Sequence, residues 1–84
     1  MLEDLKKKIL ILELELKKRD NNSFLFFNEL LDKINKGLVD DAVDSILKSF
    51  SIVQYGDFNF KEEVIFDEIW NIAEKIKNNL SPLV

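Results

Sequence analysis

Hydrophobic residues recur at alternating intervals of three and four along most of this 84-residue chain. The pattern is clearest in the last segment, where one series of positions carries Ile65, Ile69, Ile72, Ala73, Ile76 and Leu80. Intervals of three and four match the 3.6-residue turn of an α-helix, so these side chains form one stripe along the helix. Such a stripe has to be buried against another apolar surface, which favours a domain rich in helix.

Three earlier segments show the same periodicity, and local signals mark where the helices begin and end. The apolar positions are Phe24, Phe27, Leu30, Leu31 and Ile34 in the second segment, and Val39, Ala42, Val43, Ile46, Phe50 and Val53 in the third. Ser23 suits an N-cap, Gly37 suits the C′ position, and Asn59 with Glu62 has the spacing of a capping box. Pro82 prevents continuation of the last helix.

These signals predict helices near residues 3–19, 24–36, 39–53 and 60–79. The chain is long enough for one domain, residues 1–84. We predict an all-α fold, a small antiparallel four-helix bundle with short loops. Within the last helix, we expect Ile69 and Ile72 to be fully buried.

The first segment is compatible with two structures. Its helical seam consists of Leu2, Leu5, Ile9, Leu12 and Leu16. Leu10, Ile11 and Leu14 lie off that seam, and with a period of two the leucines at 10, 12, 14 and 16 would share one face of a strand. The alternative fold is therefore α+β, with residues 9–17 as a strand. In a helix, Leu10, Ile11 and Leu14 need a covering surface, which either a central position in the monomer or a homodimer contact would provide.

The composition excludes several kinds of chemistry. The chain has no cysteine and no histidine, so disulfides, thiolate chemistry and zinc or iron sites are ruled out, and the usual general base at neutral pH is missing. Two glycines cannot make a Gly-rich phosphate loop. The uncharged stretches are too short to span a bilayer, and the N-terminus lacks the layout of a secretory signal. We expect a cytoplasmic protein without a cofactor, a metal or a membrane association.

The carboxylates do not form a catalytic or metal-binding pattern. Glu63, Asp67 and Glu74 fall on the solvent side of the last predicted helix, where a carboxylate keeps an ordinary pKa. Asp40 and Asp41, together with Asp44, do not have the alternating spacing of a calcium loop and suit a helix N-terminus. We therefore expect neither catalytic residues nor metal ligands, and a protein that is not an enzyme.

The charge is unevenly distributed along the chain. Residues 1–20 carry six Lys or Arg and five Asp or Glu, whereas residues 21–84 carry six Lys and eleven Asp or Glu, a net charge of −5. This acidic part would repel a phosphate backbone, so we expect no direct contact with nucleic acid. An acidic surface is compatible with a basic protein partner, although many proteins are acidic for solubility alone.

One group of residues in the last segment is typical of a protein-binding surface. Helical projection places Trp70 at the boundary between the apolar stripe and an acidic stripe. Two interpretations fit this position: Trp70 widens the core, or it is a partly exposed aromatic anchor surrounded by charge. We predict that the partner-binding surface consists of Glu63, Phe66, Asp67, Trp70 and Glu74. The competing acidic patch consists of Asp40, Asp41 and Asp44.

From Asn28 to Lys77 the chain resembles small helical bacterial toxin-immunity proteins, the kind paired with colicins and with contact-dependent or polymorphic toxins. The similar stretches are residues 30–37, 40–44 and 62–70. The resemblance implies a stoichiometric inhibitor whose acidic surface covers a basic, often nuclease, toxin domain. The alternatives are a structural or regulatory homo-oligomeric bundle and a phage-encoded inhibitor such as an anti-CRISPR protein.

Overall fold

The computed structural model describes residues 1–80, apart from the side chains of Val53, Tyr55 and Leu80. It contains five helices: α1 (Leu2–Lys18), α2 (Phe24–Asn35), α3 (Val39–Leu47), α4 (Phe50–Tyr55) and α5 (Phe60–Leu80). No strand occurs in residues 1–80, so the prediction of an all-α fold is confirmed. The predicted places of the Val53 and Leu80 side chains on apolar faces, and the predicted role of Pro82, lie outside the part of the chain that the structure describes.

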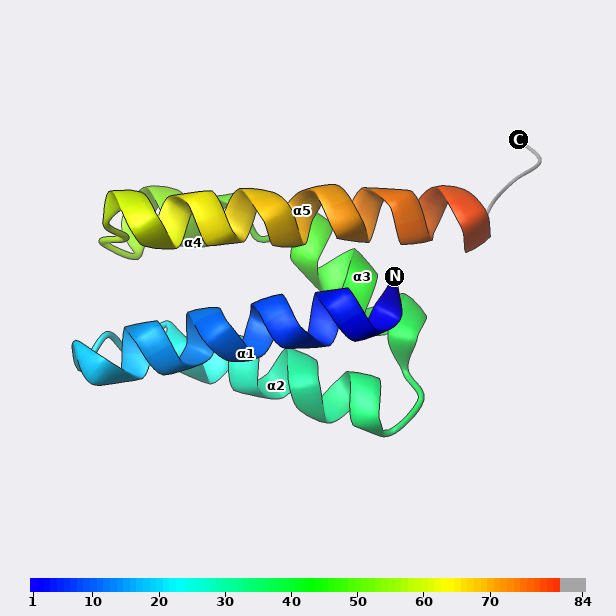
Figure 1. The fold of residues 1–84 in the computed structure, drawn as a ribbon, viewed down its shortest axis with the longest axis horizontal. Coiled ribbons are helices and arrows are strands. Elements are labelled where there is room, and N and C mark those ends of the chain that lie inside the picture. Colours follow the sequence, from blue (N-terminus) through cyan, green and yellow to red (C-terminus); the bar gives the residue numbers. More distant parts are fainter. Residues whose placement is uncertain (81–84) are drawn as a thin grey trace.

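The three longest helices run antiparallel to their neighbours, as Figure 1 shows. α1 and α2 form a hairpin, and α5 runs back along α1; α3 crosses from the end of α2 to α5, and α4 lies behind α5. Two ion pairs join α1 and α5: Lys8 lies 3.2 Å from Glu68, and Lys61 lies 2.9 Å from Glu15. The helices enclose one core in a body of 41 × 24 × 18 Å.

The first segment is a helix, and the alternative of a strand at residues 9–17 is wrong. A strand would place Leu10, Leu12, Leu14 and Leu16 on the same face. In α1, Leu12 and Leu16 are fully buried together with Leu5 and Ile9, whereas Leu10 and Leu14 point away from the core. The three- and four-residue spacing of the buried positions decides between the two structures, because only a helix brings them to one side.

The third segment is two helices, where one helix was predicted over residues 39–53. α3 ends at Leu47, and α4 begins at Phe50. Ser49 lies between them and is buried, and its hydroxyl donates to the carbonyl oxygen of Ile46 at 2.6 Å. A serine hydroxyl that bonds the preceding turn competes with the helical hydrogen bonds of the backbone. The chain therefore changes direction at Ser49, and Phe50 does not continue the buried face of Val43 and Ile46.

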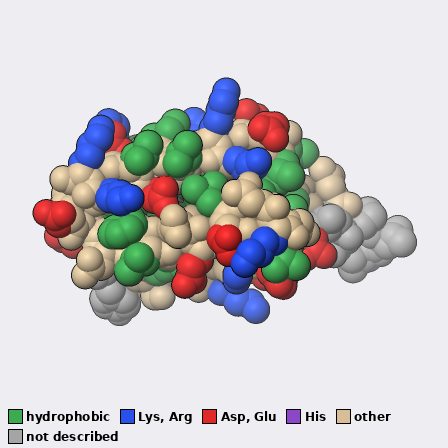
Figure 2. Space-filling view, turned by 90° about the horizontal axis from the view of Figure 1, so that it is seen from below, with side chains coloured by type: hydrophobic (Ala, Val, Ile, Leu, Met, Phe, Trp, Pro, Cys, Tyr) green, Lys and Arg blue, Asp and Glu red, His purple; other side chains and the backbone are tan. Residues whose placement is uncertain are grey.

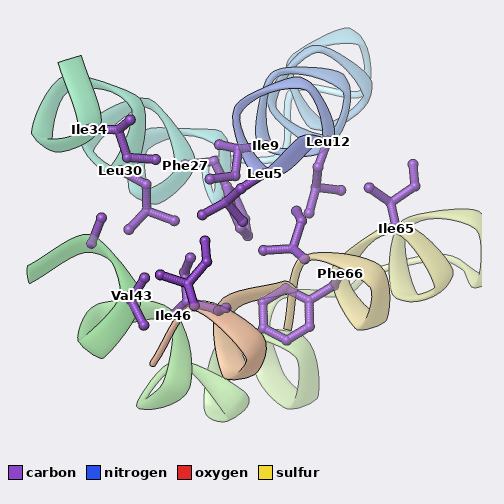
Figure 3. Close-up of a cluster of buried hydrophobic side chains, with 14 of the residues drawn as sticks. Leu5, Ile9, Leu12, Phe27, Leu30, Ile34, Val43, Ile46, Ile65 and Phe66 are labelled. Atoms are coloured by element: carbon purple, nitrogen blue, oxygen red, sulfur yellow. The ribbon is translucent and has the colours of Figure 1, made fainter. Parts of the chain in front are cut away.

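Side chains from four helices form the core, and Figure 3 shows them converging from opposite sides. The buried members are Leu5, Ile9, Leu12 and Leu16 of α1, Phe27, Leu30 and Ile34 of α2, Ala42, Val43 and Ile46 of α3, and Ile65, Phe66, Ile69, Ala73 and Ile76 of α5. The prediction that Ile69 is fully buried is confirmed. Ile72 is only partly buried at the edge of the core, so the prediction for that residue is wrong.

The helix ends confirm most of the predicted local signals. Gly37 has a φ of 83° and follows the end of α2, where the N–H of Leu38 donates to the carbonyl of Lys33 at 2.8 Å, as in a Schellman motif. Asp20 takes the same left-handed conformation after α1, with a φ of 57°. Ser23 does occupy the N-cap position of α2, but its side chain makes no capping hydrogen bond.

Candidate protein-binding site

An apolar groove lies between α4 and α5. It has a volume of about 310 Å³ and is lined by Phe50, Phe66, Asp67 and Trp70, which we call the aromatic groove. The ring centroids of Phe50 and Trp70 are 6.3 Å apart in an edge-to-face arrangement, and those of Phe66 and Trp70 are 6.1 Å apart. Aromatic rings at this spacing attract one another, so the walls of the groove are held by their own contacts.

The groove depends on the break between α3 and α4. Because the chain turns at Ser49, Phe50 is placed against Trp70 and remains 55% exposed. A phenylalanine that stays so exposed keeps most of its ring in contact with water, which is unfavourable until another surface covers it. Sequence reasoning missed Phe50 as a site residue and assigned it to the buried face. The signal that could have identified it is Ser49, a residue that favours helix ends over helix interiors.

Three of the five predicted partner-binding residues line the groove, and two of them, Asp67 and Trp70, are accessible to a partner. Trp70 is partly buried against the core, and Asp67 is exposed at the rim. Glu63 and Glu74 are exposed on α5, four residues before Asp67 and four residues after Trp70, so they extend the acidic rim in both directions. Among the residues that the structure describes, no Lys or Arg forms an ion pair with these three carboxylates.

Phe66 requires a correction. It was predicted as part of the exposed strip, but it is only 3% exposed and points into the core, as Figure 3 shows. Its ring lies 6.2 Å from that of Phe27 in an edge-to-face contact between α2 and α5. Phe66 therefore forms the floor of the groove and supports Trp70. The exposed aromatic residue beside Trp70 is Phe50, where Phe66 had been predicted.

The competing acidic patch on α3 is separate from the groove and partly neutralised. Asp40 and Asp41 are exposed in the first turn of α3. Asp44 lies 2.9 Å from Lys77 of α5, and this hydrogen bond and the charge of Lys77 lower the pKa of Asp44. The ion pair joins α3 to α5, and the positive charge of Lys77 offsets one of the three negative charges of the patch, which favours the groove as the acidic binding surface.

The predicted oligomer contact lies on a different side of the molecule from the groove residues. Leu10, Ile11 and Leu14 are 45%, 46% and 47% exposed on α1. A central position for α1 in the monomer, which would have buried them, is therefore excluded. The structure does not bring these three leucine and isoleucine side chains together with Trp70 or with the acidic residues of α5.

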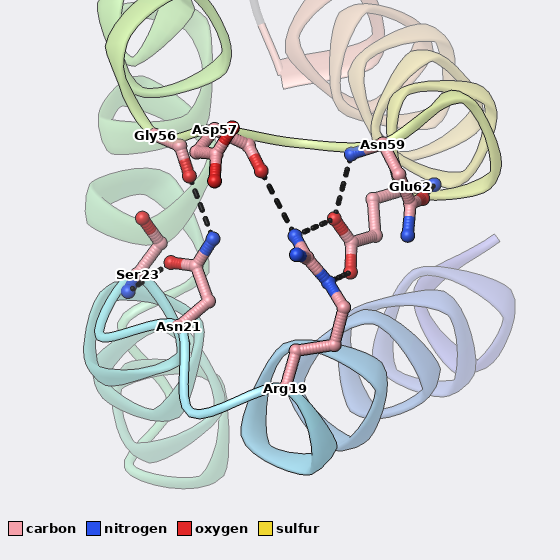
Figure 4. Close-up of polar contacts among 7 residues, drawn as sticks. All are labelled: Arg19, Asn21, Ser23, Gly56, Asp57, Asn59 and Glu62. Atoms are coloured by element: carbon pink, nitrogen blue, oxygen red, sulfur yellow. Dashed lines mark hydrogen bonds and ion pairs between the residues drawn. The ribbon is translucent and has the colours of Figure 1, made fainter.

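A polar cluster joins the loop between α1 and α2 to the loop between α4 and α5, and Figure 4 shows its contacts. Glu62 is buried and accepts from Arg19 Nε at 2.9 Å and from Arg19 Nη2 at 2.7 Å. It also accepts from the backbone N–H of Asn59 at 2.9 Å, while Asn59 Oδ1 accepts from the N–H of Glu62 at 2.9 Å. The predicted capping box is therefore confirmed, and its carboxylate holds Arg19 as well.

This cluster stabilises the fold and does not resemble an active site. Burial alone would raise the pKa of Glu62, but the hydrogen bonds from Arg19 and Asn59 and the charge of Arg19 hold it below its ordinary value. The hydrogen bond to Glu62 raises the pKa of Arg19 in turn. Arg19 Nη2 also donates to the carbonyl of Asp57 at 2.8 Å, and Asn21 Nδ2 donates to the carbonyl of Gly56 at 2.6 Å. These polar groups form hydrogen bonds with one another, and the bonds between Arg19 and Glu62 connect the end of α1 to the start of α5.

No family model, curated protein sequence or solved structure matches this chain. Its function therefore has to be inferred from the geometry of the molecule. Within residues 1–80, no three Asp or Glu side chains are grouped so that they could hold a metal ion. None of the helices in the same residues is long and apolar enough to cross a membrane.

Proposed function

We propose that this chain is a non-catalytic inhibitor that binds a basic protein through the aromatic groove. The observation that carries the proposal is the exposed ring of Phe50, which lies edge-to-face against Trp70 beside the carboxylate of Asp67. Aromatic side chains that remain partly exposed next to charge are enriched among the residues that dominate protein interfaces. The groove thus combines an apolar anchor site with a negative rim.

The chemistry of the groove favours an arginine or lysine of the partner. A cation over the face of Trp70 is attracted by the ring, and the carboxylate of Asp67 borders the same groove. The methylene groups of such a side chain would cover Phe50. Glu63 and Glu74 extend the negative potential along α5, which speeds the encounter with a basic surface.

The class of partner we propose is a bacterial toxin domain of the basic, nuclease kind. This step is supported by the resemblance of residues 28–77 to toxin-immunity proteins and by the acidic charge of residues 21–84. An inhibitor of this kind needs no catalytic group, because it blocks a basic substrate-binding surface by covering it. Exposed carboxylates such as Glu63 and Asp67 suit that role better than they suit acid–base catalysis.

The test uses Trp70, the only tryptophan of the chain, as a fluorescent reporter. Purified basic nuclease domains of bacterial toxins are titrated into the protein, and Trp70 emission and nuclease activity are followed together. We expect saturation at equimolar ratio with loss of nuclease activity for a cognate domain. If no such domain changes the emission or loses activity in the presence of the protein, the toxin-inhibitor proposal is wrong.

Two variants provide a matched comparison that keeps the reporter. Phe50→Ala removes an exposed ring inside the groove, and Phe60→Ala removes an exposed ring outside it. We expect Phe50→Ala to weaken binding by about 2 kcal/mol, roughly thirtyfold in Kd, mainly through faster dissociation. Phe60→Ala should leave Kd unchanged. Equal effects of the two variants would place the contact elsewhere.

A second pair of variants separates the two acidic patches. The triple change Glu63→Gln, Asp67→Asn and Glu74→Gln should slow association and flatten its dependence on salt, because screening acts mainly on exposed charges. The control is Asp40→Asn with Asp41→Asn in α3. If the control abolishes binding and the triple variant binds normally, the partner docks on α3 and not on the groove.

A further inference from the structure

We infer that the outward side of α1 is a second interaction surface, which pairs with α1 of a second copy of this chain in antiparallel orientation. Six residues of α1 fall within an arc of about 100° opposite its buried seam. All six are exposed and define the outer face of α1: Glu3, Lys7, Leu10, Ile11, Leu14 and Lys18. The centre of this face is apolar, and its two ends are charged.

At the edge of α1 the apolar centre adjoins a mixed surface, in which Leu31 is apolar and Glu3, Lys6, Lys7 and Asn35 are charged or polar. Leu10 borders a hollow of about 300 Å³ that Leu31 of α2 also lines. Figure 2, which views the molecule from below relative to Figure 1, shows several groups of exposed hydrophobic side chains with charged side chains between them. Single exposed hydrophobic residues are normal on protein surfaces, but neighbouring ones on one helical turn mark a contact. Covering Leu10, Ile11 and Leu14 removes apolar surface that the monomer leaves in water.

The charges at the two ends of the face identify the occupant as a second copy. Glu3 and Lys18 are equally far along α1 from the midpoint between Leu10 and Ile11. A two-fold axis through that midpoint therefore places Glu3 opposite Lys18 of the second copy. By symmetry, Lys18 lies opposite Glu3 of the second copy, so the dimer contains two such pairs. A parallel pair would instead bring like charges together at both ends, which is unfavourable.

The charged groups are free for this contact. Within the described residues, Glu3 forms no ion pair, and Lys18 has only a 3.9 Å contact with Glu15. Lys7 would lie against Leu14 of the second copy, where its methylene stem covers apolar surface and its ammonium stays in water. The outer face is thus self-complementary in the order of its charged and apolar residues, whereas the acidic rim of the aromatic groove would repel a second copy of itself.

Such a dimer leaves the aromatic groove accessible, because the groove residues come from α4 and α5 and share no position with the outer face. Each dimer would then carry two grooves and could bind two partner molecules or one partner with two basic sites. This consequence rests on the proposed function, whereas the dimer itself does not, since it is measured on the purified chain alone.

Sedimentation equilibrium of the purified full chain tests the dimer. We expect a concentration-dependent monomer–dimer equilibrium. Leu14→Glu should be monomeric with an unchanged circular dichroism spectrum, while Leu25→Glu, which changes an exposed leucine on α2, should still dimerise. A wild-type chain that remains a monomer, or a folded Leu14→Glu variant that dimerises normally, overturns the proposal.

Charge exchange tests the antiparallel register. Glu3→Lys alone and Lys18→Glu alone should each raise the dissociation constant of the dimer roughly threefold to tenfold, because each change creates two like-charge contacts. The double variant restores opposite charges and should dimerise almost like the wild type. A double variant that dimerises no better than either single variant excludes this register.

Cysteine cross-linking gives a readout that does not depend on affinity, since the chain has no cysteine of its own. In the antiparallel dimer, Leu10→Cys lies near the two-fold axis and should form an intermolecular disulfide, whereas Lys18→Cys should not, because its counterpart lies far beyond bonding distance. Efficient cross-linking through Lys18→Cys would show a parallel pair and overturn the proposal.

Discussion

The α3–α4 stretch and α5 carry the same kind of apolar periodicity in the sequence, but they behave differently in the fold. α5 is one uninterrupted helix of 21 residues, and its stripe is buried from Ile65 to Ile76. The α3–α4 stretch breaks at the buried Ser49, and only its first part is buried. α5 therefore contributes to the core along most of its length, whereas the α3–α4 stretch contributes only through α3 and leaves the ring of Phe50 exposed in α4.

The difference lies in how each helix begins. α5 begins with a reciprocal capping box, and its Glu62 is held by Arg19 from a distant part of the chain. α4 has only six residues and begins after Ser49 without a side-chain cap. A short helix has little intrinsic stability, so α4 depends on its packing. Periodicity thus predicts which residues share a face, while the end contacts decide whether the helix continues.

The largest expected effect is in α5. Ile69→Ala should lower the free energy of unfolding by about 2–5 kcal/mol, because Ile69 is fully buried and the change leaves a cavity. Urea denaturation followed by circular dichroism measures the change. An unchanged midpoint would mean that α5 does not supply the core in the way described. Asn71→Ala, an exposed position two residues further along α5, is the control and should have little effect.

The anchor of α5 should have the next largest effect. Glu62→Gln removes the charge that holds Arg19 and weakens the capping box, so unfolding should become easier by about 1–3 kcal/mol near neutral pH. The pKa of Glu62 is lower in the folded chain than its ordinary value of 4.5. Its contribution is therefore fully present above pH 4.5 and is lost as the pH falls through the folded pKa.

The role of Glu62 is tested by measuring, as a function of pH, the difference in the free energy of unfolding between the wild type and Glu62→Gln. Stability curves of the wild type and Glu62→Gln should lie furthest apart near neutral pH and converge in acid. Asp44 and Glu15 also have lowered pKa values, because Lys77 and Lys61 donate hydrogen bonds to them, so both chains lose some stability in acid. A gap between the two curves that stays constant down to strongly acidic pH would contradict the assigned role of Glu62.

A smaller effect on the free energy of unfolding is expected at Ser49, between α3 and α4. Ser49→Ala removes the hydroxyl that donates to the carbonyl of Ile46, and we expect a loss of about 1 kcal/mol. The Trp70 emission spectrum should change as well, because Phe50 is no longer held in its place beside Trp70. Ser51→Ala, at an exposed position of α4, provides the control and should change neither quantity. An unchanged spectrum for Ser49→Ala would show that the break has another cause.

The smallest effect on stability is expected for Phe50→Ala. Because more than half of Phe50 is exposed, the free energy of unfolding should fall by no more than about 1 kcal/mol, which corresponds to the lost contact with Trp70. The same variant is expected to weaken binding of the partner strongly. At this residue, the effect on binding is therefore much larger than the effect on stability. A loss of stability comparable to that of Ile69→Ala would show that Phe50 belongs to the core and would remove the main support for the groove.

The sequence by itself determined a domain rich in helix, most helix boundaries and the buried stripe of α5, but it left residues 9–17 open between a helix and a strand. It also determined local features such as the positive φ of Gly37 and the capping box of Asn59 and Glu62. These features depend on residues within one or two turns of each other, where spacing and residue type are sufficient. For the same reason, the sequence identified Leu10, Ile11 and Leu14 as lying off the buried seam.

Only the tertiary structure decided the rest. It buried Phe66 against Phe27, paired Asp44 with Lys77, and joined Arg19 to Glu62 across 43 positions of the chain. The periodicity of a helix determines the angle of each side chain around the axis, but not which flank a neighbouring helix covers. That flank depends on where distant segments pack, and for Phe50 it also depends on the break between α3 and α4, where the buried hydroxyl of Ser49 donates to the carbonyl of Ile46.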